Sequence, residues 1–304
     1  MPTPLRLLES NSPADHIKEF ELRLRAQARS EHTISCYLRD IRCFLQALPD
    51  TDIPNITPAM IDAALTDSLL TCSMDGSPKS DATMYRLKAS VRSFFAWAID
   101  AGLTQTNPAR YVITKRLSRK PPKFLTETEK RKLLKELHDR TDPLARRDRV
   151  IFELFLGTGI RIAELVNLNI DDIDLDGKHM QITGKGNIPQ IKFLKSSLRT
   201  LIRSHLKERR RFVDSEVTAL FVSSRGTRLC CRQIAHRLSY WLQKAGIQKN
   251  ITPHGLRHTF ATHLYNCTFD PLLVKQALIH RHLSTTEIYT HLADDRLEDA
   301  LEHL

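Results

Sequence analysis

Two basic side chains with complementary chemistry lie in the segment 252–258, Thr-Pro-His-Gly-Leu-Arg-His. Thr252 is a typical helix N-cap and Pro253 a typical first helical residue, so we predict that a helix begins here. Residues three apart share one face of a helix, which places the His254 imidazole beside the Arg257 guanidinium. A titratable group and a permanent cation near the positive end of a helix dipole are suited to binding a phosphate.

Further candidate residues lie earlier in the second half of the chain. The run Gly-Thr-Gly at 157–159 predicts a tight turn that delivers Arg161 at a helix start. It is no dinucleotide-binding loop, because a third glycine and a preceding strand are missing. Lys185 lies in a turn between two strand-like runs, where its ammonium could enter a neighbouring cleft. Taken alone, a surface ion pair with Glu164 explains Arg161 better, and solvation explains Lys185.

The charge of the chain indicates a polyanionic partner. Its 304 residues include 46 Lys and Arg against 35 Asp and Glu, a net charge of +11, as is typical of proteins that bind nucleic acids. A basic but otherwise ordinary enzyme is the alternative interpretation. The length favours two domains, and 41% hydrophobic residues suffice for two cores.

The composition also argues against several other classes of protein. Six cysteines without a CxxC pair predict neither a zinc ribbon nor a disulfide framework. No apolar run attains the ~18 residues of a membrane span, and the N-terminus has no secretion signal. We therefore expect a cytoplasmic protein without a membrane anchor, associated with the nucleoid if the source is a bacterium.

Apolar spacing predicts that the first domain is all-helical. Helical patterns begin near residue 15, at residue 34, after residue 57 and at residue 84. The last of these carries Arg86, Lys88 and Arg92 on its polar face, as a solvated surface or as a stripe that follows DNA phosphates. Five cations and two prolines between residues 115 and 123 exclude a helix and indicate an extended linker. The predicted boundaries are a domain of residues 1–115, a linker of residues 116–125 and a domain of residues 126–304.

The second domain is predicted to mix helices with a few strands, so the expected fold class is mainly α with a small β-sheet there. A capping box at 126–129 opens its first helix. The other predicted elements are helices at 150–156, 160–168, 196–212 and 229–245 and strands at 180–183, 191–194 and 219–222. The helix at 229–245 carries Arg232, His236 and Arg237 on its polar side and could occupy a DNA groove.

These motifs, in this order, resemble those of the tyrosine recombinase (phage integrase) family, and the chain is most similar to its two-domain XerC/XerD-like members. The resemblance covers nearly the whole chain. The matching stretches are residues 92–97, 107–109, 157–165, 184–187, 254–258 and 283–291. The resemblance implies a helical, SAM-like core-binding domain and a mixed α/β catalytic domain that ends in a docking helix.

The resemblance also implies a role for each candidate residue. Tyr289 would attack a DNA phosphodiester, giving a 3′-phosphotyrosine and a free 5′-hydroxyl. Arg161 and Arg257 would bind the non-bridging oxygens, whose charge grows in the transition state. His280 would donate a further hydrogen bond there, Lys185 would protonate the leaving oxygen, and His254 would help to move the tyrosine proton. Neither a metal, another cofactor nor ATP is implied.

The implied partner is double-stranded DNA with specific recombination sites. Four identical or two kinds of protomer would assemble on two sites and exchange strands through a Holliday junction, with a second recombinase or accessory protein as a further possible partner. The acidic, amphipathic tail at 292–304 would dock on a neighbouring subunit. Type IB topoisomerase activity and a non-catalytic DNA-binding regulator are the alternatives. One departure from the family is Ile279, where a glycine commonly precedes the histidine equivalent to His280.

Overall fold

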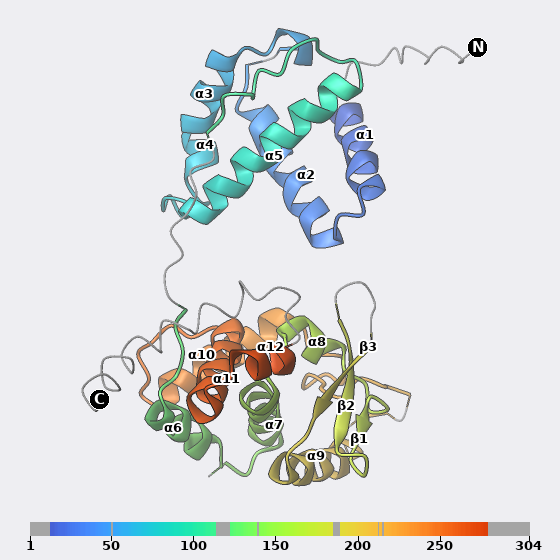
Figure 1. Ribbon diagram of the computed structural model, residues 1–304, viewed down its shortest axis with the longest axis vertical. Helices are drawn as coiled ribbons and strands as arrows, with labels where there is room; N and C mark the ends of the chain where they lie inside the picture. Colours follow the sequence, from blue (N-terminus) through green and yellow to red (C-terminus); the bar gives the residue numbers. More distant parts are fainter. Residues whose placement is uncertain are drawn as a thin grey trace. The chain divides into compact units, whose positions relative to one another are not determined.

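The chain divides into two compact units, Met1–Arg119 and Lys120–Leu304, each with its own hydrophobic core (Figure 1). The computed structural model describes residues 13–49, 51–113, 122–138, 140–184, 189–211, 213–214 and 216–278. Three of the predicted site residues, Lys185, His280 and Tyr289, lie outside this described part, as does the tail at 292–304. The expectation of a mainly helical chain with a small sheet in the second unit is confirmed.

Helices with side-chain N-caps build the first unit. They are α1 (Pro13–Ala26), α2 (Glu31–Gln46), α3 (Pro58–Thr66), α4 (Ser68–Thr71) and α5 (Asp81–Asp100), with a 3₁₀ turn at Ile53–Asn55. Ser30, Thr57 and Ser80 each accept a hydrogen bond from the backbone N–H three residues ahead. Each cap satisfies a donor that the first turn leaves unpaired, which defines where these helices begin.

An aromatic cluster forms the centre of the first unit. The Phe20 and Phe94 rings meet edge to face at a centroid distance of 5.3 Å, and Phe94 and Phe95 meet at 5.4 Å. All three side chains are almost fully buried. Such pairs stabilise by about 0.5–1.5 kcal/mol each beyond the burial of their area, so this contact holds α1 against α5.

Arg86 differs from the prediction. Its guanidinium donates to both carboxylate oxygens of the buried Asp40, at 2.8 and 2.9 Å, and so joins α5 to α2. A stripe of cations along α5 would leave this residue free for solvent or DNA, whereas the fold uses it internally. The hydrophobic spacing of α2 could not reveal this pairing, because Asp40 lies on the face that the helix buries.

Seven helices and a sheet form the described part of the second unit (Figure 1). The elements are α6 (Glu127–His138), α7 (Pro143–Thr158), α8 (Ile162–Asn167), β1 (Ile173–Asp174), β2 (His179–Thr183), β3 (Pro189–Phe193), α9 (Ser196–Arg209), α10 (Cys231–Lys244), α11 (Pro253–Thr268) and α12 (Pro271–Leu278). Asp142 caps α7 one residue before Pro143, so this helix starts earlier than the predicted 150. No described helix is long and apolar enough to cross a membrane.

The sheet is antiparallel in the order β1-β2-β3. Met180 and Ile182 of β2 point into the core, as their alternation requires. The predicted strand at 219–222 is wrong: its apolar residues are buried, but only isolated bridges form at its ends, Asn169 with Ala219 and Val222 with Arg228. A short apolar run indicates burial more reliably than it indicates a β-ladder.

The chain that enters the second unit crosses α11 at close range. The Leu125 N–H donates to the Thr259 hydroxyl at 2.9 Å, and the Leu125 carbonyl lies 3.1 Å from the His263 ring nitrogen. A Cβ on Gly255 would lie 3.1 Å from the Lys123 carbonyl oxygen. Gly255 is therefore the residue that lets this segment pack against the first turn of α11, next to His254.

A buried ion cluster joins α7 to α10. The Asp148 carboxylate is fully buried and accepts from both Arg147 and Arg237, and also from the Trp241 indole N–H at 2.8 Å. Removing one partner of a buried ion pair leaves an uncompensated charge in a region of low polarity.

We therefore expect Asp148→Asn to lower the free energy of unfolding of the second unit by about 3–5 kcal/mol, because the buried Arg147 and the half-buried Arg237 both lose their counter-charge. Chemical denaturation of the whole chain, followed by tryptophan fluorescence in a Trp97→Phe background so that Trp241 alone reports, measures this. Asp171→Asn, at an exposed aspartate, is the matched control. Equal stability of the two variants would contradict the assignment.

Candidate active site

Arg161 is delivered by the turn that ends α7. Gly159 adopts φ +59°, and a Cβ there would lie 2.8 Å from Leu278, so both its conformation and its packing require glycine. Two residues later, Arg161 is the N-cap of α8. Glu164 accepts from its backbone N–H at 2.8 Å and from its guanidinium at 2.6 Å. The predicted ion pair is confirmed, and it orients an arginine whose side chain is still 42% exposed.

Arg257 is only 2% exposed on the first turns of α11. As predicted, Thr252 caps this helix, accepting from the Gly255 N–H at 3.2 Å, and Pro253 follows it. The guanidinium donates to the carbonyl oxygen of Gly159 after α7 and, at 2.7 Å, to that of Leu278 at the end of α12. Hydrogen bonds to the main chain at two neighbouring helix ends therefore hold the Arg257 guanidinium in place.

His254 lies one turn before Arg257, and its side chain is accessible. The surrounding protein atoms still remove water from the ring, and this desolvation, followed by the charges of Arg257 and Arg161, lowers the pKa of His254. The His254 ring meets the His258 ring edge to face at a centroid distance of 4.5 Å. The imidazole is thus kept neutral near neutral pH, when it can accept a proton.

His258, to which the sequence analysis assigns no role, contacts the His254 ring. Burial, then His254 and then Arg257, lowers the pKa of His258 to about 4. It therefore stays uncharged at neutral pH and supports the His254 ring without adding a repelling cation. Its position at i+4 from His254 follows from helical spacing, but the spacing alone cannot show that both rings meet.

Lys192 is a residue that the sequence analysis missed. It lies in β3, is 4% exposed, and donates to the carbonyls of Thr158 at 3.0 Å and Ala277 at 2.7 Å. Burial, reinforced by Arg257 and Arg161 and opposed by Glu164, lowers its pKa to about 8. The sequence offers one sign of this burial: Lys192 lies in a strand between two apolar residues, Ile191 and Phe193.

The described structure thus brings together three of the six predicted residues, Arg161, His254 and Arg257. Two fixed guanidiniums beside a neutral imidazole can bind a phosphate and accept a proton from a nearby hydroxyl. Leu278, whose carbonyl Arg257 binds, precedes His280 by two residues. The predicted places of Lys185, His280 and Tyr289 relative to this group lie outside the described residues.

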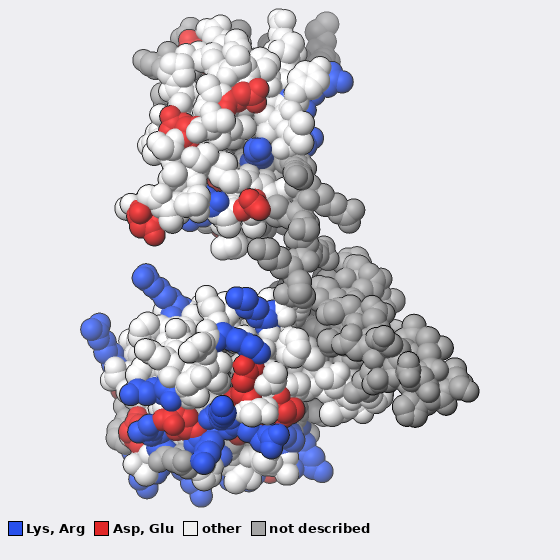
Figure 2. All heavy atoms as spheres, turned by 90° about the vertical axis from the view of Figure 1, so that its left-hand side faces the viewer, with Lys and Arg blue, Asp and Glu red and all other residues white. Residues whose placement is uncertain are grey.

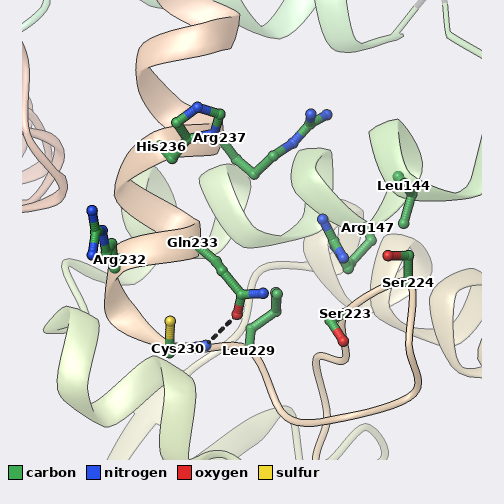
Figure 3. A pocket seen from close by; sticks show the side chains of 10 residues that line it. All are labelled: Leu144, Arg147, Ser223, Ser224, Leu229, Cys230, Arg232, Gln233, His236 and Arg237. Carbon is green, nitrogen blue, oxygen red and sulfur yellow. Dashed lines mark hydrogen bonds between the residues drawn. The ribbon is translucent and has the colours of Figure 1, made fainter.

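A second basic cluster surrounds a hollow of about 410 Å³ between α7, α10 and the loop before α10. Figure 3 shows Arg147 and Arg237 extending toward one another at this hollow, with Arg232 and His236 on the same helix as Arg237. The Gln233 side chain accepts from the Cys230 N–H at 2.9 Å and so defines the start of α10. The predicted polar side of this helix therefore opens onto a cationic recess.

One further face of the second unit carries charged side chains of both signs. Figure 2 shows, for the lower unit, the face at the left of Figure 1, where Lys and Arg are interspersed with Asp and Glu. Such mixing is typical of a solvated surface. Among the described residues, no group of three or more His, Cys, Asp or Glu side chains could hold a metal ion.

Comparison with known proteins gives consistent matches along the chain. Residues 123–296 match the Phage integrase family, and residues 17–102 match the Phage integrase N-terminal SAM-like domain. Tyrosine recombinase XerC of Vibrio cholerae is 36% identical over 263 residues, which are 86% of this chain and 83% of that protein. Tyrosine recombinase XerC of Neisseria meningitidis is 32% identical over 287 residues, 93% of each chain. The crystal structure of XerH site-specific recombinase bound to palindromic difH substrate, a post-cleavage complex, has a TM-score of 0.73 at 25% identity and covers 96% of this chain and 90% of that one.

The histidine pair generates a prediction that needs no substrate. In NMR spectra of the protein, the His258 ring signals should stay constant from neutral pH downward and titrate only near the pKa of about 4. His254→Ala should raise the pKa of His258, because it admits water and removes a ring that is positively charged at the low pH where His258 titrates. A His258 ring that titrates like a solvated imidazole would contradict the arrangement of the pair, and His258→Asn assigns the signal.

Proposed function

The chain belongs to the phage integrase family and is a site-specific tyrosine recombinase that acts on DNA; we propose that it cuts and rejoins the strands through a covalent bond to Tyr289. The observation that carries this proposal is the convergence of Arg161, His254 and Arg257. Arg257 donates to the Gly159 carbonyl, two residues before Arg161, and His254 lies one turn before Arg257 on α11. A phosphate is the ligand that satisfies two fixed guanidiniums. We further propose that the units correspond to a core-binding domain of residues 1–115 and a catalytic domain of residues 126–304, joined by a linker of residues 116–125.

In the proposed cleavage step, the Tyr289 oxygen attacks the phosphorus while the bond to the 5′-oxygen breaks. His254 takes the phenolic proton, and Lys185 gives a proton to the departing 5′-oxygen. The products are a 3′-phosphotyrosine and a free 5′-hydroxyl. Because the phosphoester energy is kept in the covalent bond, a 5′-hydroxyl from another strand can reverse the reaction without ATP.

Arg161, Arg257 and His280 stabilise the transition state in this proposal. The phosphorus becomes pentavalent, so negative charge grows on its non-bridging oxygens, and donors that are already in place need no reorganisation. Arg257 is held by two carbonyls and Arg161 by Glu164, and both are therefore oriented before DNA binds. Removal of one such donor typically costs about 10²–10³ in rate.

The basic recess at α10 supports DNA binding by the second unit. Arg232, His236 and Arg237 lie along one side of a helix, and a helix of this size fits the major groove. Arg237 is anchored by Asp148, so its position is determined before DNA arrives. In the proposal this helix contacts the recombination site while α11 presents the phosphate-binding residues.

We propose that protomers assemble as a tetramer on two sites, with the tail at 292–304 of one chain docked on the next. An apolar groove of about 450 Å³ in the second unit is a suitable acceptor. Its rim exposes large hydrophobic side chains, among them Ile191 at 57% and Phe193 at 80%. The tail offers leucines at positions 292, 297, 301 and 304, whose burial there would remove both apolar surfaces from water.

The covalent step is tested with a nicked suicide substrate that carries candidate sites adjoining the gene. We expect wild-type protein to become linked to the 3′-phosphate and Tyr289→Phe to yield no adduct, because only the phenolic oxygen is removed. Arg257→Lys, which keeps the charge but loses the planar pair of donors, should slow adduct formation about 10²-fold or more. Tyr265→Phe is the matched control for the loss of a phenol elsewhere.

The same preparation separates the alternatives. Recombination between two sites on one plasmid supports a recombinase, relaxation of a plasmid without sites indicates type IB topoisomerase chemistry, and tight DNA binding without any adduct indicates a regulator. An adduct that persists in Tyr289→Phe would rule out the proposed nucleophile.

Docking of the tail gives a further expected outcome. Deletion of residues 293–304 should abolish recombination by preventing assembly of the two sites, while binding to a single half-site survives. Phe193→Ser should reproduce the defect from the acceptor side, whereas Leu22→Ser, at a leucine that is 67% exposed in the first unit, should not. Gel shifts and plasmid recombination measure both properties, and normal recombination by the truncated chain would refute trans docking.

A further inference from the structure

Lys192 occupies a position in β3 that strand alternation assigns to the interior. Its side chain is 4% exposed, while its neighbours Ile191 and Phe193 are 57% and 80% exposed. It pairs in register with Met180 of β2, which is fully buried. The strand therefore turns two apolar residues outward and a cation inward, the reverse of what burial of apolar area favours. Such an inversion needs a specific compensating interaction.

The compensation comes from two helix ends. The Lys192 ammonium donates to the carbonyl of Thr158, the last residue of α7, at 3.0 Å and to that of Ala277, next to the last residue of α12, at 2.7 Å. The final carbonyls of a helix have no intrahelical partner and carry the negative end of its dipole. Lys192 satisfies one such carbonyl from each helix, so it acts as a shared C-terminal cap.

Arg257 binds the next carbonyl in each of these two segments. Its guanidinium donates to Gly159, directly after Thr158, and to Leu278, directly after Ala277. Two cations from β3 and α11 thus bridge the same pair of helix ends, one residue apart. In Figure 1, α7, α11, α12 and β3 come together in the second unit.

Both bridged chain segments lead to residues of the reaction centre. Arg161 follows Gly159 by two residues, and His280 follows Leu278 by two residues. We infer that Lys192 is a positioning residue of the reaction centre: by joining the ends of α7 and α12 beside Arg257, it sets where Arg161 and Arg257 meet the scissile phosphate. The inference rests on the proposed function of those two residues.

The charges around Lys192 make this role dependent on pH. Arg257 on α11 and Arg161 at the start of α8 repel its positive charge, Glu164 on α8 attracts it, and α7 and α12 face it with main-chain carbonyls. Burial, followed by the repulsion from Arg257 and Arg161 and opposed by Glu164, lowers the pKa of Lys192 to about 8. The ammonium is therefore present below about pH 8 and is lost as the pH rises through that value, when its hold on both helix ends weakens.

The experiment compares Lys192→Met and Lys192→Arg with wild type on the nicked suicide substrate at saturating enzyme, across the pH range around 8. Lys192→Met keeps the length but loses the donors, so at neutral pH we expect adduct formation to slow about 30-fold, with half-site affinity changed by no more than about threefold. Lys192→Arg keeps donors and charge, and the adjoining groove can accept its larger head. It should restore much of the rate.

The pH profile separates positioning from mere stability of the fold. Arginine stays charged throughout, so the ratio of the wild-type rate to the Lys192→Arg rate should be constant below about pH 8 and fall above it. Any effect that protonation of Tyr289, Lys185 or His254 has on both rates cancels in this ratio. Lys132→Met, at an exposed lysine of α6, is the matched control and should follow wild type at every pH.

Two results would overturn the inference: Lys192→Met that forms the adduct at nearly the wild-type rate, or a ratio of wild type to Lys192→Arg that stays flat with pH. The second result decides the matter even if Lys192→Met fails to fold. Wild-type protein that forms no adduct, with Tyr289→Phe as its reference, would instead reject the proposed function itself. The two failures are therefore distinguishable.

Discussion

The burial of the Arg257 guanidinium is the constraint on which the second unit depends. A charged group that is 2% exposed is stable only where its donors are satisfied, and here the acceptors are carbonyls just after α7 and at the end of α12. This requirement determines the turn at Gly159, since a side chain there would collide with Phe260 and Leu278. It also places α8, because Arg161 caps that helix two residues after the bound carbonyl.

As a consequence, the site carries more positive charge than its own carboxylate neutralises. After burial, the charges of Arg257 and Arg161 lower the pKa of both Lys192 and His254, and the Glu164 carboxylate opposes the shift at Lys192. Helix C-termini supply part of the missing negative potential. The remainder suits an anionic ligand, and a DNA phosphate would supply it at the point where charge grows during the proposed reaction. The neutral imidazoles of His254 and His258 fit the same environment.

Several elements follow directly from local sequence rules. Capping residues at 57, 126 and 252 mark helix starts that the structure confirms, and the amphipathic spacing of α2 and α5 predicts their buried faces. The run at 219–222 shows the limit of such rules, because isolated bridges replaced a strand although its residues are buried. Arg86 shows another limit: its partner Asp40 is distant in sequence, and only packing of α5 on α2 brings the two together.

The sequence by itself determined the two-part organisation, the mainly helical class and the motif in which Arg161, His254 and Arg257 occur, because spacing, caps and glycine turns are local properties of the chain. Only the tertiary structure decided which carbonyls hold Arg257, that His258 supports His254, and that Lys192 joins two helix ends. The physical reason is that burial and hydrogen-bond partners depend on segments far apart in sequence. A lysine between isoleucine and phenylalanine is solvated in most strands, and it becomes part of a site only where two helix ends offer it their last carbonyls.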